Sequence, residues 1–130
     1  MLRLQPPEPE WLGAIPSTDK KDKRPFLMKG VRMAFNPIDD EGFDAGQAAM
    51  LGELEATGDQ LKALKLAQSE LLRRGIADWE GLGDKDGNKL AVTPEAIERV
   101  IRDPRIRPHM VDAYVTPFLM WDAEGNASAG

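Results

Sequence analysis

The sequence predicts a small α+β domain that is mostly helical, with a short strand or hairpin element near the N-terminus. Two patterns indicate this class. Apolar side chains recur at helical spacing over most of the chain after Phe43, whereas they alternate over 25–35. The chain has 130 residues, enough for one modest hydrophobic core but not for two. We therefore expect an extended arm over 1–24, a single domain over 25–121 and a disordered tail over 122–130.

The N-terminal arm is rich in proline and ends in a mostly charged run over 18–23. Proline does not fit the interior of a helix, and the charged run offers little apolar surface to bury, so an extended arm is expected. Trp11 is the largest apolar side chain of this arm. We expect it to anchor the arm either to the domain itself or to a partner.

The alternation over 25–35 predicts one strand, which Gly30 interrupts as a bulge or a hairpin bend. Four apolar side chains share one face of it: Leu27, Val31, Met33 and Phe35. The segment 89–92 is a weaker strand candidate. Any sheet is therefore small and must be completed by the arm or by another chain, and an unpaired edge would favour a homo-oligomer.

Two helices are predicted next, over 43–56 and 59–74. Acidic residues precede both, as suits a helix start, and Gly75 behind two arginines ends the second. Gly46 and Gly52 either allow another backbone to pack closely on the first helix or leave it soft. The apolar stripe of the second helix consists of Leu61, Leu64, Ala67, Leu71 and Leu72. Leu66 points away from this stripe and suits a subunit contact.

The remainder of the chain is expected to alternate turns with short helices. Trp79 is interpreted as a core anchor, and the glycine-rich stretch 81–88 as turns. Thr93 is a natural N-cap, followed by Pro94 in the first helical position. A last helix then begins near Pro108. Pro117 is expected to end or kink it, which leaves an apolar segment over 118–121.

Composition excludes several classes of function. The chain has no cysteine and a net charge of -5, which argues against thiolate chemistry and against general nucleic-acid binding. No apolar run is long enough for a membrane span, and the start does not read as a signal peptide. His109 is the only histidine, and no arrangement typical of a catalytic or metal site surrounds it. We therefore expect a non-enzymatic protein without a cofactor or metal.

One stretch of the sequence partly matches a calcium-binding loop. Asp84, Asp86, Asn88 and Glu95 fall at ligand positions of a calcium loop when Asp84 is counted first. Lys89, however, stands where the sharp turn of that loop needs glycine. The stretch is therefore interpreted as a plain turn followed by a helix cap.

The C-terminal half of the sequence resembles phage tail assembly chaperones and related prophage proteins. The residues that carry the resemblance are Ala77, Asp78, Trp79, Glu80 and Gly81, the turn closing on Gly87, then Leu90, Thr93, Pro94 and Glu95, a helix ending in Val100 and Ile101, and the pair Ala113 and Tyr114. The resemblance implies a cytoplasmic protein of the infected host cell that binds the tape measure and tail tube proteins during morphogenesis and is absent from the finished particle.

A binding role of this kind needs exchangeable apolar surface. The candidates are Trp11 on the arm, Leu66 off the helical stripe, and Phe118, Leu119 and Trp121 after the last proline. Three alternatives stay open: a structural protein of the head-tail or tail-tube joint, a small protein-binding domain of another kind, and a small enzyme or calcium-responsive module.

Overall fold

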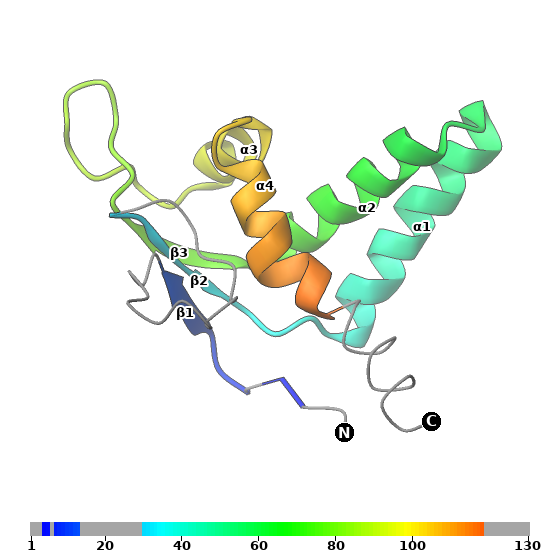
Figure 1. Ribbon diagram of the computed structural model, residues 1–130, viewed down its shortest axis with the longest axis horizontal. Coiled ribbons are helices and arrows are strands. Elements are labelled where there is room, and N and C mark those ends of the chain that lie inside the picture. The colour runs from blue at the N-terminus through cyan, green and yellow to red at the C-terminus, as the bar shows by residue number, and fades with distance from the viewer. Residues whose placement is uncertain (1–3, 6, 14–29, 119–130) are drawn as a thin grey trace, which may run out of the picture.

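A computed structural model of the protein describes residues 4–5, 7–13 and 30–118, and it confirms the α+β class. The elements, in chain order, are β1 (Glu10–Gly13), β2 (Arg32–Phe35), α1 (Asp40–Thr57), α2 (Gln60–Gly75), β3 (Ile76–Glu80), α3 (Pro94–Arg102), α4 (Arg107–Met110) and the π-helical turn η1 (Val111–Val115). In Figure 1 the three strands lie on one side, the α1–α2 hairpin on the other, and α3 and α4 between them.

The strands form one antiparallel sheet in the order β1-β2-β3. Part of the N-terminal arm therefore completes the sheet, which was one of the two predicted alternatives. β3 was not predicted, because a tryptophan between two acidic residues does not show the alternation of a half-buried strand. The weaker strand candidate over 89–92 does not form, since Lys89 makes only an isolated bridge to Gly83.

The core lies where the inner face of the sheet meets α2, α3 and the last helix. Its largest fully buried side chains are Met33, Leu72, Trp79, Ile101, Met110 and Val115. Trp79 is fully buried beside its strand partner Met33, and its indole Nε1 donates a hydrogen bond of 2.7 Å to the carbonyl of Leu90. This bond satisfies the single polar group of the ring, so Trp79 is confirmed as a core anchor.

The α1–α2 hairpin has capped helix starts close to the predicted ones. The carboxylate of Asp39 accepts the Gly42 N–H, and the carboxylate of Asp59 accepts the Lys62 N–H. Gly58 ends α1 in the left-handed conformation with φ of 71°. Among the described residues, no helix combines the length and apolar composition of a membrane span.

Pro117 changes the last helix without ending it. The chain is α-helical over Arg107–Met110, π-helical over Val111–Val115, and helical again over 116–118. Proline has no N–H to donate to the carbonyl four residues earlier, and its ring would clash with that carbonyl. The wider turn relieves both problems, and the Thr116 N–H bonds to the carbonyl of Val111 instead. The helix is therefore distorted near Pro117, and Phe118, the first residue of the predicted apolar segment, is still helical.

Candidate functional site

Trp11 lies on β1, against the outer face of its own sheet. The guanidinium of Arg32 on β2 sits 4.5 Å from the centre of the Trp11 ring, a distance typical of a cation–π contact. Arg32 also binds both carboxylate oxygens of Glu80 on β3, at 2.6 and 2.9 Å. The domain itself thus provides an anchor for Trp11, although 38% of the residue remains exposed.

The other predicted site residues lie in different places. Phe118 is half-buried and packs edge-on against Phe43 of α1, with ring centres 6.1 Å apart. Leu66 is 38% exposed and lies on α2, whereas Trp11 lies on β1. Leu119 and Trp121 lie outside the described residues. The structure therefore does not bring Trp11, Leu66 and Phe118 together into one surface.

A larger apolar surface lies on the hairpin, and sequence reasoning did not identify it. We call it the hairpin face, and it consists of Met50, Leu51, Leu54, Leu61 and Leu64. Leu51 is 59%, Leu61 66% and Leu64 42% exposed, whereas the other two are half-buried. A group of large exposed apolar side chains typically marks an interaction site, whereas single exposed apolar residues are common on any protein surface.

Helical spacing places Met50, Leu54 and Leu64 in one direction, with Leu51 and Leu61 towards the two outer edges of the same side. Phe43 and Leu71 mark the side of α1 and α2 that packs against the rest of the protein. Met50 follows Phe43 by seven residues, and Leu64 precedes Leu71 by seven, so both lie almost directly in line with these core residues. The hairpin face is thus a continuation of the core-facing side beyond the point where the last helix covers it.

The leucines are excluded from between the two helices because small residues occupy that seam. Gly46 lies against the carbonyl of Ala67, where a β-carbon would come within 3.6 Å of the oxygen. Ala63 is fully buried in the same seam. Gly46 is buried in this seam, although a β-carbon there would make only ordinary van der Waals contact, whereas Gly52 is exposed and has open space beside it.

The two helices of the hairpin carry opposite charge. α1 contains five acidic residues and no basic one, and α2 contains four basic residues and one acidic one. Two ion pairs join the helices, Lys62 with Glu53 at 3.0 Å and Arg74 with Glu41 at 3.5 Å. Hydrogen bonding to Glu70 is the main cause that raises the pKa of Arg74. The two ion pairs thus link α1 with α2, and exposed pairs of this kind contribute about 0–1 kcal/mol each.

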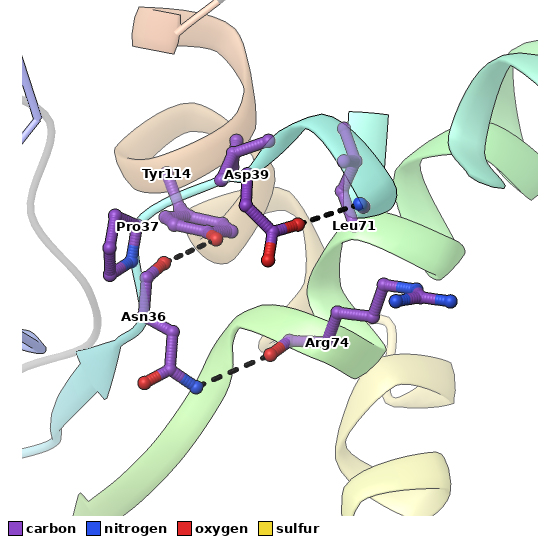
Figure 2. Close-up of a pocket in the computed structure, with 8 residues that line it drawn as sticks. Asn36, Pro37, Asp39, Leu71, Arg74 and Tyr114 are labelled. Atoms are coloured by element: carbon purple, nitrogen blue, oxygen red, sulfur yellow. Dashed lines mark hydrogen bonds between the residues drawn. The ribbon is translucent and has the colours of Figure 1, made fainter. Parts of the chain in front are cut away.

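An open cavity of about 290 Å³ lies at the base of the hairpin. Figure 2 shows Tyr114 beside Asn36 and Asp39, with Arg74 along the opposite wall. The Tyr114 hydroxyl donates a hydrogen bond of 2.6 Å to the Asn36 carbonyl. The side-chain amide of Asn36 donates one of 3.3 Å to the Arg74 carbonyl. Burial, followed by the negative charge of Asp39, raises the pKa of Tyr114, so its hydroxyl stays a hydrogen-bond donor. These polar groups bind one another, and the arrangement is typical of a structural junction.

The polar groups of the acidic turn over 84–88 also form hydrogen bonds with one another. The Asp84 carboxylate accepts the backbone N–H groups of Asp86 and Asn88, at 2.9 and 3.0 Å. Lys89 lies 3.5 Å from the Asp78 carboxylate. In the part of the chain that the structure describes, no group of three or more acidic or histidine side chains is placed to hold a metal ion.

Comparisons of the chain with protein-family models, with curated proteins and with solved structures found no match.

Proposed function

We propose that this protein works by binding another protein through the hairpin face, in the role of the phage tail assembly chaperones that its C-terminal half resembles. The observation that carries the proposal is the exposure of Leu51, Leu61 and Leu64 on one side of a projecting hairpin. Burial of a leucine side chain contributes about 1.5–3 kcal/mol, so covering three of them can hold a partner without a deep pocket.

The residues that carry the resemblance have mainly structural tasks. Trp79 fills the core, the Thr93 hydroxyl caps α3 by accepting the Ala96 N–H, and Tyr114 stacks on Phe35 with ring centres 4.4 Å apart. Such residues specify a fold, whereas partner contact requires accessible side chains. The hairpin face offers those side chains, and it is separate from the segment that carries the resemblance.

Co-expression with the tape measure and tail tube proteins of a phage tail module would test this function. We expect the tagged protein to capture the tape measure protein and to be absent from purified particles. Replacing Leu61 and Leu64 by glutamine should abolish capture, because these side chains are exposed and their loss leaves the core intact.

Leu66→Gln is the matched control. Leu66 follows Leu64 by two residues, so it lies on the opposite side of α2. Loss of capture with this variant alone would place the contact on the Leu66 side instead, as the sequence predicted. Presence of the protein in particles at fixed stoichiometry would overturn the chaperone role and favour a structural protein of the tail.

A further inference from the structure

The hairpin face lies between two flanks of opposite charge. Asp44 and Glu55 of α1 stand seven residues before and four residues after Leu51, so they follow one edge of the face. Lys65 of α2 stands four residues after Leu61 and follows the other edge. Arg107 of α4 adds a second cation there, since its guanidinium donates a hydrogen bond of 2.9 Å to the Lys65 carbonyl.

Three of these flanking charges, those of Asp44, Glu55 and Lys65, are available to a partner. Neither Asp44, Glu55 nor Lys65 forms an ion pair with another described residue, in contrast to Glu53 and Lys62, which pair with each other between the two helices. A segment that covers the leucines would therefore meet carboxylates along one side and cations along the other. Complementary charge at the edge of an apolar contact fixes orientation and suppresses wrong partners.

The shape of the face suits a helix. Its apolar side chains recur at intervals of three and four residues on two antiparallel helices. The chain's own last helix packs on the same side at the base of the hairpin, where Tyr114 meets Gly75 and Phe118 meets Phe43. The uncovered part of α1, from Gln47 to Thr57, spans about 16 Å at the rise of an α-helix. This length accommodates about three turns of a partner helix.

Building on the proposed function, we propose that the occupant is an amphipathic helix of another protein, about three turns long, with basic side chains facing Asp44 and Glu55 and acidic side chains facing Lys65 and Arg107. The helix completes a three-helix arrangement with α1 and α2. Its direction along the hairpin follows from its own charge pattern, because reversing the helix exchanges its two flanks.

A second copy of the chain fits this surface less well. In a two-fold contact with the axis across the helices, α1 would lie on α1 and acidic residues would face acidic residues. With the axis along the helices, the last helix of the second copy would meet the last helix of the first, which already covers this side of the hairpin near Phe43. A helix with one basic and one acidic flank avoids both conflicts.

Stapled helical peptides of about four turns provide the test, since short unstapled helices are marginal in water. Three peptides share one leucine stripe and differ in their flanks: lysine on one and glutamate on the other, lysine on both, or glutamate on both. Fluorescence anisotropy with the full chain should show the tightest binding for the mixed peptide. Leu61→Gln with Leu64→Gln should weaken it about tenfold or more, and Leu66→Gln should leave it unchanged.

Charge reversal then tests the flanks directly. Asp44→Lys with Glu55→Lys should weaken the mixed peptide about three- to tenfold at low salt and make the glutamate-flanked peptide the preferred one. Equal binding of the three peptides, or full binding to the Leu61/Leu64 variant, would overturn the proposal. So would a dimer of the unmodified chain, by sedimentation, that the same variant converts to monomer.

The two proposals can fail separately. Loss of peptide binding with retained capture of the tape measure protein would remove the amphipathic helix as the occupant and leave tail-protein binding intact. Peptide binding without capture of any tail protein would keep the helix-binding surface and remove the phage role.

Discussion

The phenol ring of Tyr114 occupies the space that a β-carbon on Gly75 would need. Such a β-carbon would come within 2.5 Å of both the ring and its hydroxyl oxygen. Gly75 is the last residue of α2, and Tyr114 lies on η1, so their contact fixes how the last helix crosses the base of the hairpin. Gly75 is not among the glycines with positive φ, which means that its role is to leave room rather than to adopt an unusual backbone conformation.

Replacing Gly75 by alanine should destabilise the protein by about 1–3 kcal/mol, because the ring of Tyr114 must move out of well-packed surroundings. Chemical denaturation would measure the loss. Gly52→Ala is the control, since Gly52 is exposed with nothing within 4 Å and lies in the same hairpin. That change should instead stabilise the helix by about 0.5–1 kcal/mol. Equal effects of the two substitutions would contradict the steric explanation.

Tyr114→Phe keeps the ring that stacks on Phe35 and removes the hydrogen bond to the Asn36 carbonyl. The free energy of unfolding should fall by about 1 kcal/mol at neutral pH. The folded state also raises the pKa of Tyr114, so its contribution is fully present below the pKa of an unfolded tyrosine, about 10, and is lost as the pH rises beyond it.

Alkaline denaturation of the two proteins would check this second effect. The unmodified protein should lose stability above about pH 10, where unfolded tyrosine ionises, and Tyr114→Phe should not show that loss. Tyr114 is the only tyrosine of the chain, so tyrosinate absorbance reports on it alone. An ordinary titration of this absorbance in the folded protein would refute the effect of burial.

Gly81 and Gly87 separate two costs of losing a glycine. Both have positive φ, 86° and 82°, but a β-carbon on Gly81 would come within 2.0 Å of the Gly30 carbonyl oxygen, whereas one on Gly87 would meet nothing within 4 Å. Gly87→Ala should therefore cost about 1–2 kcal/mol from the backbone alone. Gly81→Ala should cost clearly more, because the strand end beside Val31 must also shift. Thermal unfolding of both variants would rank them, and the reverse order would be inconsistent with this packing.

Asp103 should titrate in strong acid. The side chain of Arg105 and then its backbone N–H lower the pKa of the Asp103 carboxyl to about 2. Because the folded pKa is depressed, the stabilising contribution is present above the unfolded value of about 3.9 and is lost as the pH falls towards the folded value. NMR titration of the carboxyl should show this pKa, and Arg105→Gln should return it towards the ordinary value. An unchanged pKa in that variant would rule out Arg105 as the cause.

Local signals made much of the helical part predictable. Asp59, Thr93 and Pro94 stand at helix starts as predicted, since capping depends on only three or four neighbouring residues. β3 was missed because its pairing with β2 joins residues far apart in sequence, such as Arg32 and Glu80. Pro117 was expected to end or kink the last helix; it does not end the helix, and a single π-helical turn precedes it.

The hairpin face could not be predicted from an apolar stripe alone. Leu61 and Leu64 share their stripe with Leu71 and Leu72, which are buried, so spacing assigns all four to the core. Whether such a side chain is covered depends on how far the rest of the protein reaches along the hairpin. The small residues Gly42, Gly46, Ala63 and Ala67 were the available signal, because a seam that they close leaves no room for leucines inside it.

The hairpin is joined to the rest of the protein at one end only, where Phe43 meets Phe118 and Gly75 meets Tyr114. Towards Gly58 its helices pack chiefly on each other. Amide protons should therefore exchange with solvent fastest near Gly58 and progressively more slowly towards Gly75, as in any structure that opens locally before it unfolds globally. The leucines of the hairpin face lie along the faster part of this gradient, where the backbone adjusts most readily to the shape of whatever covers them.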